Sequence, residues 1–254
     1  AAQQSQGKLP VPGESTKTIH LIFGDCAIAG VGMKSVGSRT ATGLSVSYLQ
    51  TIADGFVAGG FECHMFSLLN NLPERLVSMT REACVLVIRG GAYAVCKNVD
   101  ALWEEQLRAP VDKRGRLRGR VVNKHARWNL LYGPEAKEPN YAEGQPRVVA
   151  YGTAPELDSA RSMMPRWFGP ELRDPVVDMT MYFDPLRCGI GFHGGTERNV
   201  AATLCLGRST MAHFMWFYQA TPVGNPLKLW LHHGDVIVTS DKANGQDWKR
   251  TSIP

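Results

Sequence analysis

The chain has 254 residues, of which 44% are hydrophobic, and a formal net charge of +5. This length and apolar content are those of one ordinary globular domain. No apolar run approaches the ~18 to 20 residues of a membrane helix, and the polar residues 1–16 lack the apolar core of a signal peptide. The six cysteines form no CxxC pair, which favours reduced, buried thiols over a disulfide framework or a zinc site. We therefore expect a soluble cytoplasmic protein with a flexible lead-in over 1–16.

The first half of the chain mixes helical and strand patterns. Apolar residues at helical spacing predict helices over 44–56 and 99–108, and the apolar run 83–88 predicts a buried strand. A further helix is expected over 156–168, interrupted by Pro165.

From Pro146 onward short strands follow one another at close intervals. The expected strands are 147–151, 179–183, 188–193, 200–206, 213–219, 228–232 and 235–239. Many short strands separated by turns with Pro and Gly predict a sandwich or jelly roll. We expect one domain over 17–254 of the α+β class, mainly β, in which N-terminal helices flank a jelly-roll core at roughly 146–254.

Much of the positive charge lies in the run from Lys113 to Arg120. Charge runs are usually solvated, flexible loops. The alternative is a basic rim that attracts phosphates. The run is too short and too poor in aromatic residues to indicate a duplex-binding surface by itself.

The run Gly189-Ile190-Gly191-Phe192-His193-Gly194 has the GxGxxG spacing of a dinucleotide-binding turn. That turn needs a helix opening at its third glycine, so that the helix N-terminus can hold pyrophosphate. The run 200–206 that follows predicts a strand, so the context disfavours a nucleotide dehydrogenase.

The same residues resemble a metal site. The segment Cys188–Arg198 resembles the iron-ligand turn of AlkB-like iron(II)/2-oxoglutarate dioxygenases, and more closely the turn His-Gly-Asp-x-Glu-Arg of bacterial and large-virus relatives. The resemblance covers nearly the whole chain, through short segments in the same order. They are Phe23-Gly24-Asp25, Gly32-Met33, 119–127, 231–238 and 242–249.

The resemblance implies a double-stranded β-helix (jelly roll) and an iron(II) ion held by a 2-His-1-carboxylate triad, with positions open for 2-oxoglutarate and O2. His193 occupies the first ligand position. Without the resemblance, the favoured interpretation is an ordinary turn histidine whose ring nitrogens are hydrogen-bonded within the protein. The resemblance further implies that Tyr182 contacts 2-oxoglutarate and that Glu197 and Arg198 support the metal ligands.

At the carboxylate position of the family this chain has Gly195. Glycine has no ligand atom, so the metal keeps one more open coordination position and lacks the negative charge of the carboxylate. A chloride ion can supply both the ligand and the charge. The His-x-Gly arrangement resembles that of iron/2-oxoglutarate halogenases. The alternative is an inactive relative that has lost iron binding.

The distal histidine and the oxoglutarate-binding arginine of the family have no counterpart after Trp248. We expect both beyond Pro254, with His233 as the fallback ligand.

The segment Arg127–Gly133, followed by Tyr141, resembles the nucleotide-recognition lid of the AlkB-like enzymes. Aromatic rings there stack on a base, while Lys and Arg hold phosphate. The expected substrate-binding residues are Lys124, Arg127, Trp128, Tyr132 and Tyr141. An equally weighted alternative makes Trp128 and Tyr132 core residues of a strand.

On this scaffold the His-x-Gly turn resembles that of nucleotide halogenases. The resemblance implies an iron(II)-, 2-oxoglutarate- and chloride-dependent halogenase that chlorinates a sugar carbon of a free purine nucleotide such as 2′-deoxyadenosine monophosphate. The modest charge argues against a nucleic-acid partner, and no membrane partner is expected. The alternatives are an AlkB-like nucleotide or nucleic-acid hydroxylase or demethylase, and a non-catalytic nucleotide-binding relative.

Overall fold

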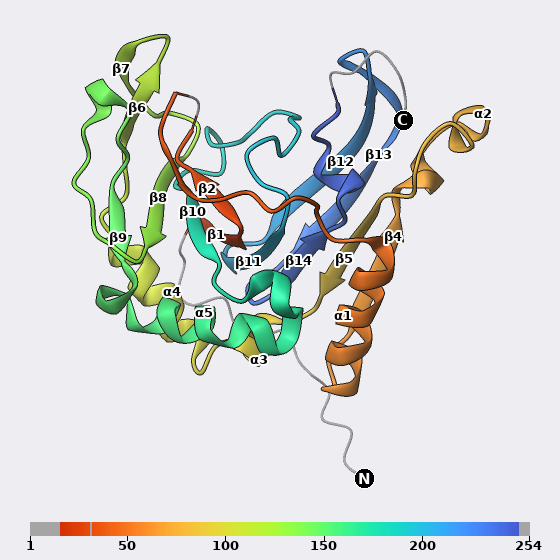
Figure 1. Ribbon diagram of the computed structural model, residues 1–254, viewed down its shortest axis with the longest axis horizontal. Helices are drawn as coiled ribbons and strands as arrows, with labels where there is room; N and C mark the ends of the chain where they lie inside the picture. Colours follow the sequence, from red (N-terminus) through yellow and green to blue (C-terminus); the bar gives the residue numbers. More distant parts are fainter. Residues whose placement is uncertain (1–15, 31, 249–254) are drawn as a thin grey trace.

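An eight-stranded sheet is the centre of the fold (Figure 1). The structure, a computed structural model, describes residues 16–30 and 32–248. The strand order is β4–β5–β14–β11–β1–β10–β8–β9, and neighbours are antiparallel except β8 and β9. In that order the strands are Cys63–Ser67, Cys84–Ile88, Val236–Thr239, Ala201–Gly207, Thr18–Gly24, Val176–Tyr182, Trp128–Gly133 and Val148–Ala150. The fold is therefore α+β and mainly β, as the sequence predicts.

Helices cover one face of this sheet. Side chains alternate between the faces of a strand, and on β1 the fully buried Ile19, Leu21 and Phe23 join the core shared with the helices. The helices are α1 (Val46–Ala58), α3 (Ala92–Val95), α4 (Val99–Arg108) and α5 (Pro155–Phe168). Figure 1 shows α3, α4 and α5 side by side along one side of the sheet. No helix in the described residues is long and apolar enough to cross a membrane.

Local signals explain where the helices begin. The side chain of Ser45 accepts a hydrogen bond from the N–H of Tyr48, and that of Asn98 accepts one from the N–H of Ala101. These N-caps satisfy helical N–H groups that would otherwise have no partner. Helix α4 coincides with the predicted 99–108, and α1 begins two residues after the predicted start.

Helix α5 starts with Pro155 and has no side-chain N-cap of its own. The carboxylate of Glu105 on α4 instead accepts hydrogen bonds from the N–H groups of Glu156 and Leu157, at 2.9 and 3.0 Å. This contact joins two helices across the core and places a negative charge at the positive end of α5. The helix continues through Pro165 to its end, so the predicted interruption does not occur.

Hairpins occupy the opposite face of the sheet. They are β2–β3 (Cys26–Ile28 and Ser35–Gly37), β6–β7 (Arg114–Leu117 and Arg120–Asn123) and β12–β13 (Thr210–Tyr218 and Thr221–Leu231). Figure 1 shows β6–β7 and β12–β13 at opposite ends of the sheet, on the side away from α3, α4 and α5. Leu229 and Leu231 of β13 form a second core with Val85, Val87 and Ile237 of the sheet.

Short helical segments complete the described chain: η1 (Leu68–Asn71), α2 (Glu74–Val77), η2 (Tyr141–Glu143), η3 (Tyr151–Thr153), η4 (Pro170–Leu172) and η5 (Lys242–Asn244). All six cysteines are free thiols, as the sequence predicts, but Cys63 and Cys188 are only half-buried. The lead-in predicted over 1–16 lies outside the described residues, except Thr16.

Two sequence predictions about the β structure are wrong. The segment 188–193 is not a strand: a turn capped by Asp184 ends at Cys188, and Gly189 and Gly191 beyond it offer no side chains for packing. The sheet is also not confined to 146–254, since β1, β4, β5 and β8 come from earlier in the chain. The basic run Lys113–Arg120, expected as a loop, belongs largely to the β6–β7 hairpin.

Tyr132 is a core residue. It is 1% exposed, and its hydroxyl donates a 2.7 Å hydrogen bond to Oε1 of Gln106, which is also fully buried. The Tyr132→Phe substitution should lower the free energy of unfolding by about 1 to 2 kcal/mol, because the buried amide oxygen loses its partner. Urea unfolding measures this change. Tyr218→Phe, on an exposed ring, is the matched control and should change stability by less than about 0.5 kcal/mol. Equal effects of the two substitutions would contradict the buried hydrogen bond.

Candidate functional site

A row of polar side chains crosses the middle of the sheet on the face away from the helices. In strand register, Asn129 of β8 lies opposite Thr180 of β10, which lies opposite His20 of β1, which lies opposite Cys205 of β11. The amide of Asn129 donates to the hydroxyl of Thr180 at 3.2 Å. Tyr182 extends the row, with its ring 5.4 Å from that of His20. Burying polar side chains at the centre of a sheet costs free energy unless they form hydrogen bonds to protein, water or a ligand. This row therefore marks a candidate binding site.

Three buried polar atoms on this face have no hydrogen-bond partner within the described residues. They are Nε2 of His20, Oδ1 of Asp178 and Nη1 of Arg198. A buried polar atom without a partner costs roughly 1 to 3 kcal/mol, and native proteins nearly always satisfy it with protein, water or ligand. The atoms therefore offer both donors and acceptors to a bound molecule or ordered water.

Burial determines the protonation state of His20. It lowers the pKa of the imidazole to about 4, because the charged form loses its hydration. At neutral pH the ring is uncharged, so one ring nitrogen can donate a hydrogen bond and the other can accept one. Burial also raises the pKa of the Tyr182 hydroxyl, which therefore stays protonated as a donor.

A buried ion pair anchors the loop that precedes β11. Nη2 of Arg198 lies 2.8 Å from Oδ2 of Asp178, and both side chains are about 5% exposed (6% and 5%). Asp25 holds the end of the same loop, since its carboxylate accepts hydrogen bonds from the N–H groups of Asn199 and Val200. Arg198, expected to support metal ligands, thus joins the loop to β10. Glu197 lies 3.7 Å from the same guanidinium.

Lysine and arginine side chains lie at one border of the polar row. Nζ of Lys124 donates to the carbonyl oxygen of Ala29 at 2.9 Å and to Oδ1 of Asn129 at 3.1 Å. Burial lowers the pKa of this ammonium to about 8. Lys124 and Arg127 line a cavity of about 260 Å³, whose other walls include Ala29, Gly30 and Met33 and residues of the β6–β7 hairpin. The cavity can accept an anion.

His193 and Gly195 lie in an exposed loop that packs against the segment 244–248. Nδ1 of His193 is 2.9 Å from the carbonyl oxygen of Gly191, and the N–H of Gly195 donates to the carbonyl oxygen of Asn244 at 2.6 Å. A Cβ atom at Gly194 would lie only 1.9 Å from the carbonyl oxygen of Gly245, whereas at Gly195 the nearest atom would be 3.3 Å away. Packing therefore requires glycine at 194, whereas a side chain at 195 would need only a small shift of Asn244.

His233 lies at the other end of β11 from this loop. Its Nδ1 accepts a hydrogen bond from the N–H of Gly207 at the end of β11, and its Nε2 is 3.5 Å from Oδ1 of Asp100. The seven residues of β11 span roughly 20 Å. The structure thus separates His233 from His193 and argues against the fallback ligand.

No three His, Cys, Asp or Glu side chains form a metal-holding group within 16–30 and 32–248. A non-haem iron site of this type needs three protein ligands, or two with a halide. The described residues place His193 in the loop but do not by themselves complete such a set.

The aromatic residues expected to bind the base lie elsewhere. Trp128 and Tyr132 point to the helix-covered face, because they alternate with Asn129 along β8. The Trp128 ring stacks on Phe183 at 4.0 Å, with Nζ of Lys113 4.5 Å above it. The hydroxyl of Tyr141 donates to Oδ1 of the buried Asp112 at 2.7 Å. Tyr132 is thus a core residue, and Trp128 is half-buried against the same core.

Sequence reasoning missed His20, Asn129, Asp178 and Thr180. Each is a polar residue at an alternate position of a strand that is otherwise apolar, as in Ile19-His20-Leu21. That signal is weak in one strand and becomes specific only when the register aligns several strands.

Comparisons with known proteins add one finding about ancestry. The chain is 33% identical over 241 residues to "Uncharacterized protein R156" of Acanthamoeba polyphaga mimivirus. These matched residues make up 95% of this chain and 94% of the relative. No protein-family model matches the chain. No solved structure matches it either.

His20 should make stability depend on pH. Its folded pKa of about 4 lies below the ~6.5 of an unfolded histidine, so the unfolded chain takes up a proton first as pH falls. The contribution of His20 to the free energy of unfolding is fully present above pH ~6.5 and is lost as the pH falls towards 4. At pH 4.5 the loss is on the order of 2 kcal/mol. Urea unfolding at pH 7.0 and 4.5 should show a smaller loss for His20→Gln than for the parent. Identical losses would show that His20 is not held neutral by the fold.

Proposed function

This chain belongs to the same protein family as the mimivirus protein R156, and we propose that it is an iron(II)/2-oxoglutarate-dependent nucleotide halogenase. The proposed reaction replaces an unactivated C–H on the sugar of a purine nucleotide, such as 2′-deoxyadenosine monophosphate, with C–Cl. The resemblance of the turn His193–Arg198 to AlkB-like oxygenases motivates the proposal.

The observation that carries the proposal is the difference between the two glycines after His193. Gly194 is required by the close approach of Gly245, so its identity has a structural cause. The constraint at Gly195 is weaker, because a Cβ atom there would lie 3.3 Å from the carbonyl oxygen and 3.9 Å from the Cβ atom of Asn244, and a shift of Asn244 by a few tenths of an ångström would admit it. Packing therefore accounts for the missing side chain less completely at 195 than at 194, which supports a role for the vacancy in the site. A vacancy at this position is what halide binding beside a metal needs.

The proposed fold is a double-stranded β-helix, in which the eight-stranded sheet is one layer and β12–β13 contributes to the other. The polar row from Asn129 to Cys205 then lies between the layers, where a cosubstrate would contact it. His20, Thr180 and Tyr182 supply hydrogen bonds there. Lys124 and Arg127 supply positive charge for the nucleotide phosphate.

Two alternatives remain testable. A non-catalytic nucleotide-binding relative is favoured by the incomplete ligand set of the described residues. A hydroxylase or demethylase would use the same polar face with a different outcome at the carbon.

Iron binding separates the first alternative from the proposal. The full chain, prepared without oxygen in the presence of ferrous iron and 2-oxoglutarate, should bind one iron and show a weak visible absorption band. His193→Ala should lose both while the free energy of unfolding changes little, because the side chain is exposed. Nucleotide binding by a parent chain that takes up no iron would support the binding relative. Mass spectrometry of nucleotides after reaction with chloride and O2 distinguishes chlorination from hydroxylation.

Gly195→Asp tests the halide vacancy. The carboxylate would fill the space and repel chloride, an effect worth several kcal/mol where water is excluded. Chlorinated product should fall by orders of magnitude, since each ~1.4 kcal/mol is a factor of ten. Gly195→Ala is the control, because it adds the same Cβ atom without charge and should retain most of the chlorination. Undiminished chlorination by Gly195→Asp would show that chloride does not occupy the vacated position.

A further inference from the structure

Four rings lie close together where the candidate metal-ligand turn meets the β12–β13 hairpin. They are Phe192, His213, Phe217 and Trp248, called here the hairpin aromatic cluster. The centroid distances are 5.6 Å between Phe192 and Phe217, 5.6 Å between Phe217 and Trp248, and 6.4 Å between Phe192 and His213. Such spacings place the rings in mutual contact.

This cluster touches the turn directly. A Cβ atom at Gly194 would lie 2.4 Å from Cδ1 of Trp248, so the indole packs against the backbone next to His193. Phe192 is the neighbour of His193 on the other side. A ring stacked on the cluster would therefore lie beside the residue that is proposed to hold the metal.

The cluster is open to solvent. Phe192 is 46% exposed, His213 is exposed, and Phe217 and Trp248 are half-buried. Exposed aromatic surface gathered in one place is uncommon unless it binds something. Two of the rings, Phe217 and Trp248, also line a small pocket of about 70 Å³.

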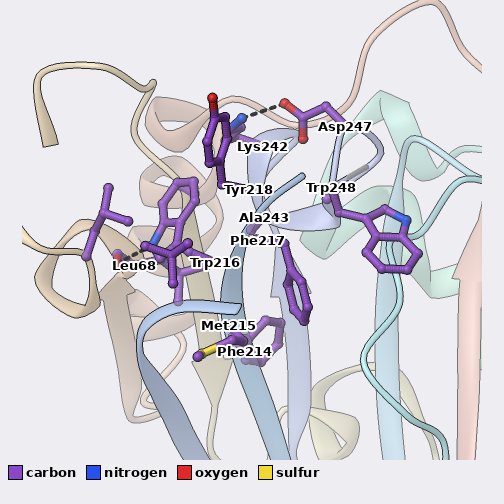
Figure 2. Close-up of a pocket in the computed structure, with 14 residues that line it drawn as sticks. Leu68, Phe214, Met215, Trp216, Phe217, Tyr218, Lys242, Ala243, Asp247 and Trp248 are labelled. Carbon is purple, nitrogen blue, oxygen red and sulfur yellow. Dashed lines mark hydrogen bonds and ion pairs between the residues drawn. The ribbon is translucent and has the colours of Figure 1, made fainter. Parts of the chain in front are cut away.

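That pocket has a polar rim. Figure 2 shows the ion pair between Lys242 and Asp247, 2.5 Å long, above the rings of Phe217 and Trp248. Both charged side chains are mostly buried, at 7% and 17% exposure. The pair places polar groups next to an aromatic surface, the combination that recognises a planar heterocycle.

The loop connects this cluster to the cationic cavity over a short distance. The N–H of Gly189 donates to the carbonyl oxygen of Ala126, beside Arg127 and the cavity. Phe192 follows three residues later, so its Cα atom lies at most about 11 Å from that of Gly189. A nucleoside monophosphate has a base at one end and a phosphate at the other, so it carries one group suited to the cluster and one suited to the cavity.

We propose that Phe192, Phe217 and Trp248 form the stacking site for the purine ring of the substrate, with its phosphate directed to Lys124 and Arg127. This inference rests on the proposed function for the identity of the ligand. It replaces Trp128 and Tyr132, whose side chains lie on the helix-covered face of the sheet. The sugar then lies along the loop that carries His193 and Gly195.

Calorimetric titration of the full chain with two ligands tests the stacking site. The ligands are 2′-deoxyadenosine monophosphate and 2-deoxyribose 5-phosphate, which lacks the base. Phe192→Leu and Trp248→Leu should each weaken binding of the nucleotide at least fivefold, as expected for loss of base stacking. Binding of the sugar phosphate should stay within twofold of the parent. Phe192 is exposed enough that its replacement leaves the fold intact.

Trp230→Leu is the matched control, because Trp230 is 53% exposed on β13 and lies outside the cluster. It should leave the affinity for both ligands unchanged. Nucleotide binding at parental strength by both cluster variants would overturn the stacking site, as would equal losses for both ligands or a parent that binds no purine nucleotide. Base-dependent binding by a chain that takes up no iron would overturn the halogenase and leave the stacking site in place.

Discussion

Strand β1 imposes the constraint on which the rest of the structure depends. It lies between β10 and β11, and its alternating side chains must satisfy two different surroundings. Ile19, Leu21 and Phe23 enter the core beneath the helices, while His20 faces the other way. A shift of register by one residue would bury His20 among apolar side chains and expose the core residues. The helical layer thereby specifies which side chains reach the candidate site.

The buried pair of Arg198 and Asp178 extends this constraint to the loop. Breaking a buried ion pair leaves an uncompensated charge, so the strand and the end of the loop are held together. The contacts of Asp25 with the backbone at 199 and 200 act in the same direction. The loop that carries His193 is therefore positioned at its C-terminal end by polar contacts to β10 and to the turn after β1.

Chemistry at this site would combine three environments that the fold keeps separate. The polar row offers neutral hydrogen-bonding groups, the cavity at Lys124 offers positive charge, and the hairpin aromatic cluster offers ring surface. The loop passes between the last two. A ligand with an anionic end and an aromatic end has a group suited to each of them, which is the link between the proposed substrate class and the arrangement of the chain.

The sequence by itself determined the α+β class, helix α4 to the residue, and the existence of most strands after residue 146. These features are local, because helical spacing, alternation and glycine content act over a few neighbouring residues. The face on which Trp128 and Tyr132 lie was decided only by the tertiary structure, since either face of β8 could have carried the core. The polar row was likewise decided there, because His20, Asn129, Thr180 and Cys205 come from four strands spread over 186 residues and meet only through strand register.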